Sequence, residues 1–278
     1  MDHTTRTPVK PADLDVGVIY TSERPWMRRL LGTLRGSSAG LDVRLVMVDN
    51  RSRDGAEQWR TIFPRLRVVR NARRLFYAAN LNRILEVSTA PYVLLLNTDV
   101  FFDPEESCLA KMVDFMRRHP QCGIAGCRVH HEDGTYAYPA RRFQTIPVIL
   151  SRRFGLAKLM SATVDHYLYR DHGILDAWQC DWLSGCFMMA RREAVTQVGP
   201  FDLRFLKYFE DVDMCLRMAR AGWQTMYNGE TYCYHLERRA SKRLLSVDAW
   251  KHARSYLLWL RKWGFSPIAA SAAQPRAA

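Results

Sequence analysis

Residues 92–99 read Tyr-Val-Leu-Leu-Leu-Asn-Thr-Asp, a wholly apolar run that ends in three polar residues. An uninterrupted apolar run of this kind is typical of a strand that is covered on both faces, as the strands of parallel sheets are. Further apolar-rich runs occur upstream at 16–20, 43–48 and 66–70. Stretches with helical spacing lie between the runs, at 26–34, 56–63 and 76–87, and another opens at Pro104 and continues to about His119. This alternation predicts an α/β fold with a mostly parallel central sheet and helices on both faces.

The second half of the sequence is less regular. Residues 141–172 are basic and aromatic without a clear period, and the run at 182–189 predicts one buried strand. Helices are expected at 191–198 and 211–221, each ended by a glycine, short strands at 223–227 and 231–234, and a basic amphipathic helix at 248–263. We therefore divide the chain into a flexible tail (1–13), a globular domain (14–240) and a C-terminal helical extension with a loose tail (241–278).

The composition limits the partners and the compartment. The chain of 278 residues has 41 basic and 28 acidic side chains, a formal net charge of +13, which favours a polyanionic partner such as nucleic acid, an anionic membrane or a phosphorylated substrate. The N-terminal residues form no apolar stretch, no run is long enough to span a bilayer, and the seven cysteines include no Cys-x-x-Cys pair. Cys122 and Cys127, followed by His130 and His131, lack the spacing of a zinc site. We expect a cytoplasmic protein with reduced thiols.

Three motifs that would define other classes of enzyme are missing from the sequence. No Gly-x-Gly-x-x-Gly follows the first strand, which argues against a dinucleotide oxidoreductase. No Gly-x-x-x-x-Gly-Lys-Ser/Thr loop is present, which argues against a P-loop ATPase, and there is no Gly-x-Ser-x-Gly elbow. Any bound phosphate must therefore be held by a metal ion and basic side chains rather than by a glycine-rich loop.

Two of the expected strands end in acidic residues, Asp49 and Asp99. In an open α/β sheet ligands bind outside the carboxyl ends of the strands, so both carboxylates are placed for binding. Carboxylate oxygens presented in this way suit Mg²⁺ or Mn²⁺ that is bound partly through the phosphates of a substrate. An Asp after a strand also commonly forms a turn or caps a helix, and for Asp49 this alternative is equally good. It is weaker for Asp99, because the next helix is expected only from Pro104.

A second acidic group, Glu210-Asp211-x-Asp213, stands at the start of the helix expected at 211–221. Acidic residues favour the N-terminus of a helix, which accounts for one or two of the three. That preference does not explain the aromatic run at 201–209 before them, beside which a carboxylate would keep a raised proton affinity and act as a general base. His235 follows a short strand and is either structural or a ligand that completes a divalent metal site.

Several segments resemble the signatures of glycosyltransferase family 2. Residues 48–55, Val-Asp-Asn-Arg-Ser-Arg-Asp-Gly, are similar to its Val-Asp-Asn-x-Ser-x-Asp-Gly signature, and residues 94–100, Leu-Leu-Leu-Asn-Thr-Asp-Val, to its modified Asp-x-Asp segment. Three further stretches resemble the acceptor-side and catalytic segments of the family: Trp-Leu-Ser-Gly at 182–185, Gly-Pro-Phe-Asp at 199–202 and Tyr-Phe-Glu-Asp-Val-Asp-Met at 208–214. The resemblance covers about 14–240, and its order and spacing match the bacterial rhamnosyltransferase-like branch.

The resemblance implies a GT-A (Rossmann-like) fold, a nucleotide-diphospho-sugar donor, a Mg²⁺ or Mn²⁺ cofactor and inversion at the anomeric carbon. Residues 14–130 would form the nucleotide-sugar half of the domain, and 131–240 the acceptor and catalytic half. By their places in the family motifs, Asp211 would be the general base with Glu210 beside it, and Asp99 and His235 would bind the metal. The donor would be bound by Thr21, Asp49, Asn50, Asn80, Asn97 and Thr98. The acceptor would be bound by Trp182, Ser184, Gly185 and Asp213, the last of which would alternatively support the site.

The sequence departs from the family pattern at two positions. Asn97 stands where the first Asp of Asp-x-Asp is usual, so one carboxylate ligand is missing. Leu75 replaces the Gly that usually precedes Phe in the segment at 71–80, which bears on the backbone and shape of the donor pocket. The cations expected to offset the charge of a leaving diphosphate are Arg73 and Arg74, or Arg238 and Arg239.

The expected function is transfer of a sugar, with rhamnose from dTDP-rhamnose as the best candidate, to a hydroxyl of a glycan or lipid-linked glycan in cell-surface polysaccharide synthesis. The basic, aromatic helix at 250–263 either lies on an anionic membrane at its cytoplasmic face or packs on the domain, and both alternatives stay open. A catalytically degenerate GT-A protein that binds glycans or recruits partners is the main rival, against which the intact Asp99, Asp211 and His235 argue. Nucleic acid is not expected as a partner, because the sequence has no recognisable nucleic-acid-binding motif.

Overall fold

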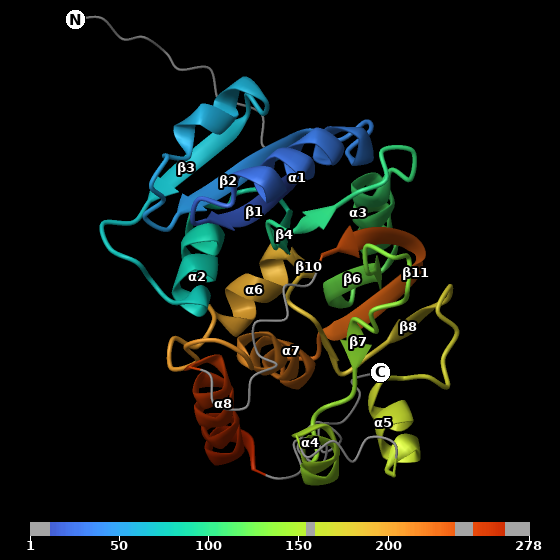
Figure 1. The fold of residues 1–278 in the computed structure, drawn as a ribbon. Helices are drawn as coiled ribbons and strands as arrows, with labels where there is room; N and C mark the ends of the chain where they lie inside the picture. The colour runs from blue at the N-terminus through green and yellow to red at the C-terminus, as the bar shows by residue number, and fades with distance from the viewer. Residues whose placement is uncertain (1–11, 154–158, 237–246, 265–278) are drawn as a thin grey trace, which may run out of the picture.

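The structure is a computed structural model that describes residues 12–153, 159–236 and 247–264 (Figure 1). Its centre is a nine-stranded mixed sheet in the order β3-β2-β1-β4-β10-β6-β11-β5, with β8 (Ala177–Gln179) paired to β11. The first four strands are mutually parallel: β1 (Leu14–Tyr20), β2 (Val43–Asp49), β3 (Leu66–Arg70) and β4 (Tyr92–Leu96). The expected parallel α/β half is therefore confirmed.

The other half of the sheet mixes strand directions. β10 (Phe187–Arg191) runs antiparallel to both β4 and β6 (Cys122–His130), and β11 (Gln224–His235) runs parallel to β6. The short β5 (Val100–Phe101) closes the sheet antiparallel to β11. These pairings leave β1 to β4, β6 and β11 all pointing the same way. The strand ends that carry Asp49, Asp99 and His235 consequently lie at one edge of the sheet.

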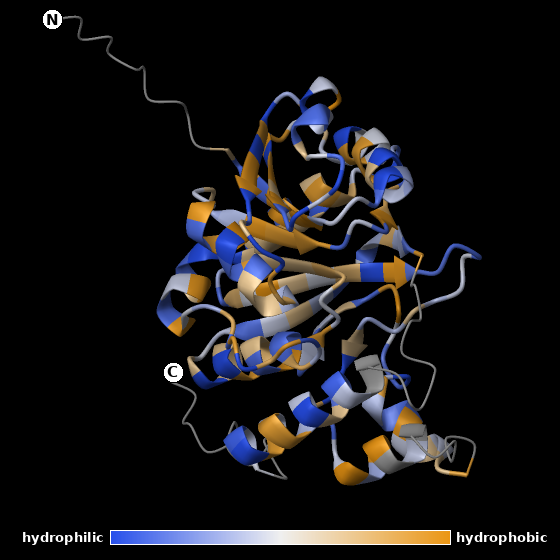
Figure 2. Ribbon diagram, turned by 60° about the vertical axis from the view of Figure 1, so that its left-hand side comes forward, coloured by the Kyte–Doolittle hydropathy of each residue, from blue (hydrophilic) through white to orange (hydrophobic). Residues whose placement is uncertain are grey.

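Helices cover both faces of the sheet, as predicted. In β4 the side chains of Tyr92, Leu94 and Leu96 join one buried cluster, while those of Val93 and Leu95 join the other. The first cluster includes residues of α1 (Arg24–Ser37) and α3 (Cys108–Arg118), and the second those of α2 (Tyr77–Val87), α6 (Arg192–Val198) and α7 (Glu210–Arg220). Figure 2 shows the result: the central strands are largely apolar, and the helices present polar residues outwards.

One glycine sets how closely a helix approaches the sheet. Gly17 lies in the middle of β1, and a Cβ atom built there would stand 2.2 Å from Cγ2 of Ile84 in α2. No side chain fits at that distance, so the absence of one at position 17 lets α2 pack directly on the strand. Helix α2 carries Tyr77 and Asn80 to the edge of the sheet where the candidate site lies.

Several expected elements differ from the structure because tertiary pairing overrides local pattern. The run at 182–189 is two strands, β9 (Trp182–Leu183) and β10, and β9 pairs with β7 (Ala140–Arg141) in a separate two-stranded sheet. The two strands expected within 223–234 are one irregular strand, β11. The segment at 56–63 forms only the 3₁₀ turn η1 (Glu57–Thr61), and α3 begins at Cys108 rather than at Pro104. The segment at 141–172 contains α4 (Ile146–Arg153) and α5 (Ser161–Tyr167).

The C-terminal helix α8 (Val247–Trp263) packs against the domain beside α7 (Figure 1). Trp259 is fully buried, and its ring lies 5.9 Å from that of Phe209 and 6.0 Å from that of Phe143. Among the residues that the structure describes, no helix combines the length and apolarity needed to cross a membrane. Of the two alternatives for this helix, membrane contact or packing on the domain, the structure shows packing on the domain for its inner face.

Candidate active site

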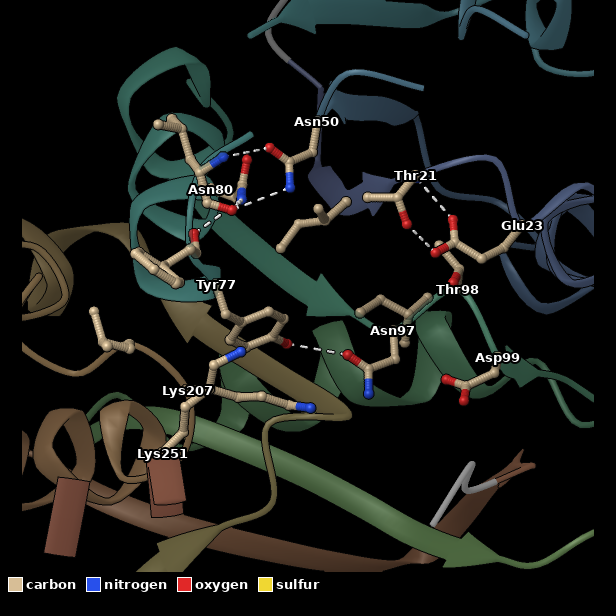
Figure 3. A pocket seen from close by; sticks show the side chains of 15 residues that line it. Thr21, Glu23, Asn50, Tyr77, Asn80, Asn97, Thr98, Asp99, Lys207 and Lys251 are labelled. Carbon is tan, nitrogen blue, oxygen red and sulfur yellow. Dashed lines mark hydrogen bonds between the residues drawn. The ribbon is translucent and has the colours of Figure 1, made fainter. Parts of the chain in front are cut away.

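A pocket of about 470 Å³ opens at the carboxyl edge of the sheet (Figure 3). Five of the six residues expected to bind a donor line it, together with Asp99: Thr21, Asn50, Asn80, Asn97 and Thr98. The remaining one, Asp49, is buried outside the lining, where its Oδ1 accepts a 2.7 Å hydrogen bond from the backbone N–H of Ser52. Asp49 thus makes the turn that was its alternative role. The other lining residues are Ile19, Glu23, Leu75, Phe76, Tyr77, Leu96, Leu206, Lys207 and Lys251.

Asn50 and Asn80 are held in a buried amide network that also includes Asn71. The Nδ2 of Asn71 donates to Oδ1 of Asn50 at 3.0 Å and to Oδ1 of Asn80 at 2.6 Å. Asn50 in turn bonds both backbone groups of Leu75, at 2.8 Å through its Oδ1 and at 3.1 Å through its Nδ2. The backbone at Leu75 has no positive φ, so this loop does not need the glycine usual in the family. The network makes one wall of the pocket rigid.

Tyr77 connects this pocket to the acidic residues of α7. Its hydroxyl donates to Oδ1 of Asn97 at 3.0 Å and lies 3.4 Å from the carbonyl oxygen of Gly185. The amide nitrogen of Asn97 points away from Tyr77 (Figure 3). Burial raises the pKa of Tyr77 well above its usual value, and the charges of Glu210 and Asp211 add to the effect. The phenol is therefore a neutral donor that fixes the orientation of the Asn97 amide.

Asp99 and His235 are brought together from the ends of β4 and β11. Oδ1 of Asp99 lies 3.2 Å from Nε2 of His235, and the backbone N–H of Leu236 donates to the carbonyl oxygen of Asp99 at 3.0 Å. Burial lowers the pKa of His235, but Cys186 and Asp99 outweigh it and raise that pKa to about 10. The pair is thus a hydrogen-bonded ion pair in the protein without bound metal.

The chemistry of this pair fits a divalent ion that the substrate helps to bind. Carboxylate oxygen and imidazole nitrogen are both ligands that Mn²⁺ accepts. Within the described residues no group of three or more His, Cys, Asp or Glu side chains could hold a metal. Asp99 and His235 would therefore supply two ligands, and phosphate oxygens and water the rest.

Glu210, which is buried, and Asp211, which is partly buried, form a carboxylate pair at the first turn of α7. Oδ2 of Asp211 accepts from the N–H of Gly185 at 3.1 Å, and Oδ1 accepts from its neighbour Val212 at 2.9 Å. Burial raises the pKa of Asp211, and burial together with the charge of Asp211 raises that of Glu210 to about 8. Glu210 is 5% exposed, and its Oε2 has no hydrogen-bond partner. Near neutral pH Glu210 therefore retains its proton.

The residues expected to bind the acceptor take different positions. Gly185 contacts Asp211 directly, and the backbone N–H of Ser184 donates to the carbonyl oxygen of Pro139 at 2.9 Å. Trp182 is buried, with its indole N–H donating to the carbonyl oxygen of Arg142 at 2.8 Å. The carboxylate of Asp213 is fully buried and bound by three groups: Nε of Arg217 at 2.9 Å, Nε1 of Trp263 at 2.8 Å and Nζ of Lys262 at 2.7 Å. These contacts suit the supporting role that was the alternative for Asp213.

Sequence reasoning missed four residues of the site. Asn71 could have been predicted, because it directly follows β3. Polar residues at the carboxyl ends of the neighbouring strands, Asp49 and Asp99, were recognised by the same criterion. Tyr77 lies in the family segment at 71–80 and Lys251 in the basic helix expected at 250–263, but their places in the pocket, like that of Lys207, depend on tertiary contacts. Of the cations expected to face a diphosphate, Arg73 and Arg74 are exposed outside the pocket lining, and Arg238 and Arg239 lie outside the described residues.

The pocket lies outside the carboxyl ends of the parallel strands β1, β2 and β4, where the order of the strands reverses between β1 and β4, and this is where open α/β sheets bind their ligands. The model of Glycosyl transferase family 2 matches residues 15–199, and the chain belongs to this family. A second model, Glycosyltransferase (GlcNAc), matches residues 140–264. The predicted family and the predicted class of enzyme, a nucleotide-sugar-dependent glycosyltransferase, are thereby confirmed.

Two curated relatives are rhamnosyltransferases. The chain is 26% identical over 260 residues to N-acetylglucosaminyl-diphospho-decaprenol L-rhamnosyltransferase of Mycobacterium tuberculosis, which covers 89% of this chain and 83% of the relative. It is 24% identical over 173 residues to rhamnosyltransferase WbbL of Escherichia coli, at 62% of each chain. The predicted rhamnosyltransferase-like branch is confirmed by these similarities.

Solved structures confirm the GT-A fold. Mannosyltransferase PcManGT from Pyrobaculum calidifontis, in complex with GDP-Man and Mn²⁺, superimposes with a TM-score of 0.58 at 18% identity, covering 96% of this chain and 77% of that one. GalNAc-T7 with UDP, GalNAc and Mn²⁺ gives a TM-score of 0.64 at 12% identity, over 97% of this chain and 53% of that one. At these identities the likeness concerns the fold.

Proposed function

We propose that the protein transfers rhamnose from dTDP-rhamnose to a hydroxyl of a lipid-linked glycan, with inversion, during synthesis of a cell-surface polysaccharide. The observation that carries this proposal is the polar chain from Asn97 through Tyr77 and Gly185 to Asp211, which joins the pocket to a partly buried carboxylate. The similarity to two rhamnosyltransferases supports the sugar and the kind of acceptor.

The donor binds in the pocket with its nucleotide toward Asn50 and Asn80 and its diphosphate toward Asp99. The rigid amide network keeps the nucleotide side of the pocket open without further ordering on binding, which preserves affinity. A divalent ion held by Asp99 and His235 would offset the negative charge that develops on the diphosphate. The Mn²⁺ in two structures of the same fold supports a metal cofactor.

Asp211 acts as the general base. As the acceptor oxygen forms its bond to the anomeric carbon, the bond from that carbon to the diphosphate breaks, and the hydroxyl proton passes to a carboxylate oxygen of Asp211. The N–H of Gly185 holds Oδ2 in place for this transfer. The raised proton affinity that burial gives to Asp211 makes it a stronger base than an exposed carboxylate. One displacement on the face opposite the leaving group inverts the anomeric carbon.

The decisive experiment incubates the purified protein with Mn²⁺ and a panel of nucleotide sugars and measures release of the nucleoside diphosphate. We expect dTDP-rhamnose to be turned over faster than UDP-GlcNAc, GDP-mannose or UDP-galactose, and faster still with a lipid-linked acceptor. Preference for another sugar would overturn the rhamnose assignment. Binding of glycans without turnover of any donor would favour the degenerate binding protein instead.

We also propose that the protein works at the cytoplasmic face of an anionic membrane, where a lipid-linked acceptor lies. The aromatic side of α8 is packed on the domain, but Trp250 and Leu257, two turns apart, are exposed next to the exposed cations Arg254 and Arg261. This outer stripe has the composition of an interfacial helix. We expect flotation with liposomes that contain anionic lipid, and loss of flotation in the double variant Trp250→Ser, Leu257→Ser. Equal flotation of both proteins would exclude this surface.

A further inference from the structure

The pocket contains two cations that no motif of the sequence indicates. Among its lining residues, all of them in the part of the chain that the structure describes, only Lys207 and Lys251 carry positive charge. Lys207 comes from the loop before α7, and Lys251 from the first turns of α8. Both side chains reach the pocket on the side of Tyr77 and Asn97 (Figure 3). The acidic members of the lining are Glu23 and Asp99.

Lys251 lies on the face of α8 that packs on the domain. The same face, at spacings of three or four residues, carries Ser255, the buried Trp259 and Lys262. Burying a lysine on the packed face of a helix costs free energy unless its ammonium group reaches solvent or a partner. Here the side chain of Lys251 extends from that face to the pocket, which it lines.

Contacts along α8 fix this lysine relative to Lys207. The hydroxyl of Ser255, one turn after Lys251, donates to the backbone carbonyl oxygen of Lys207 at 2.9 Å. At the other end of the helix, Nζ of Lys262 lies 2.8 Å from Asp202 and 2.7 Å from Asp213. The two pocket lysines are therefore held side by side from two separate segments.

We propose that Lys251 and Lys207 bind the diphosphate of the nucleotide donor, so that α8 is part of the donor site rather than an appendage. This inference rests on the proposed function and adds the ligands that replace the expected arginines. The diphosphate of the donor is negatively charged and would be repelled by the carboxylate of Asp99 alone. The ammonium groups of Lys207 and Lys251, which are compact positive charges in the same pocket, attract the diphosphate and offset this repulsion. The charge of Lys207 also acts on Glu210, whose pKa it lowers against the larger effect of burial. The same cation thus acts on both the leaving group and the carboxylate pair.

The test measures binding of dTDP, UDP and thymidine to the full chain by calorimetry, with Mn²⁺ present. We expect Lys251→Gln to lower affinity for dTDP by about 10-fold or more, the loss of one charged hydrogen bond, and to leave affinity for thymidine unchanged. Lys251→Arg should retain most of the affinity. The matched control is Arg35→Gln, which removes the same charge from an exposed position in the last turn of α1 and should bind dTDP like the wild type.

The outcomes separate this inference from the proposed function. If the wild type binds neither dTDP nor UDP, the proposed nucleotide donor itself is wrong. If the wild type binds dTDP and Lys251→Gln binds it equally well, the donor stands and the role of α8 is overturned. If Lys251→Gln loses thymidine and dTDP alike, its effect is on the shape of the pocket, and the assignment to the diphosphate is again overturned.

Discussion

The two halves of the domain hold the polar groups of the site in different ways. In the first half, residues 14–130, hydrogen bonds join the amides of Asn50, Asn71 and Asn80 to one another and to the loop around Leu75, although Oδ1 of Asn71 has no partner. In the second half, the segment before α7 places Tyr208 and Phe209 at φ angles of 71° and 68°, and Glu210 keeps a buried oxygen without a partner. Left-handed backbone at non-glycine residues and unpaired buried oxygens both cost free energy. Left-handed residues are not confined to the second half, because Ser22 and Arg51 in the first half have φ angles of 85° and 61°. The halves differ in that the asparagines of the pocket are joined in one hydrogen-bond network, whereas Glu210 directly follows two left-handed residues and belongs to no such network.

The first half helps to hold the segment before α7 in place. Asn82 of α2 makes two hydrogen bonds to the backbone of Phe201, at 2.7 Å and 2.9 Å, at the start of the segment that leads to α7. On the far side, α8 binds Asp213 through Lys262 and Trp263. The costly conformation at 208–210 is thus fixed from both sides, which is how strain persists at a site.

The sharpest test of this division is Asp211→Asn. If Asp211 serves chemistry and takes no part in donor binding, turnover should fall at least ~100-fold, the low end of general-base contributions, while dTDP affinity stays near that of the wild type. Asparagine keeps the shape and an oxygen that can accept from Gly185. The control Asp114→Asn removes an exposed carboxylate that binds Arg118 and should change neither quantity. Full turnover in Asp211→Asn would remove Asp211 from the mechanism.

A second test addresses the point where the halves meet, Asp99 and His235. We expect Asp99→Ala to abolish the gain in dTDP affinity that Mn²⁺ gives to the wild type, because one of two protein ligands is lost. The measurement is a nucleotide titration with and without Mn²⁺, and the titration without metal serves as the internal control. The same Mn²⁺ response in both proteins would refute a metal at this pair.

The third test uses pH to detect the cost of the carboxylate pair. Burial and Asp211 raise the pKa of Glu210 from 4.5 to about 8, so the folded protein retains a proton that the unfolded chain releases near pH 4.5. Stability is therefore lost as pH rises from about 4.5 to about 8. Glu210→Gln carries no such proton and should melt at least about 2 °C higher than the wild type at pH 8, a shift of roughly 1 kcal/mol, with little difference at pH 4.5.

The control for this pH series is the exposed Glu193→Gln on α6, which should follow the wild type at every pH. A difference between Glu210→Gln and the wild type that stays constant from pH 4.5 to pH 8 would mean that the proton on Glu210 does not control stability.

The smallest expected effect concerns the connection between the halves. Tyr77→Phe removes the hydroxyl that orients Asn97, one neutral hydrogen bond, and should raise KM for the donor by about 5-fold with little change in kcat. In the background of Asn97→Ala the same substitution should have no further effect, because its target is gone. Additive losses in the double variant would show that Tyr77 acts independently of Asn97.

The same contrast explains what the sequence could predict. The parallel half was predictable because its central strands are buried on both faces and are rich in apolar residues, most clearly the continuous run at 92–96. The run at 182–189 looks similar but belongs to two sheets, and the only local sign of the break is the Ser184–Gly185 pair within the run. Asp99, His235 and Asp211 were predicted from motifs with fixed spacing. Lys251 was not, because its role depends on where a helix far along the chain packs.

The absence of a side chain at Gly17 affects the shape of the pocket, although Gly17 does not line it. A single methyl group there would collide with Ile84 and push α2 away from the sheet. Helix α2 carries Tyr77 and Asn80, so the displacement would move two walls of the pocket although position 17 itself never meets a ligand. A substitution at this buried position would change the shape of the pocket without altering any residue that contacts substrate. A mutational screen confined to residues that contact substrate would therefore miss it.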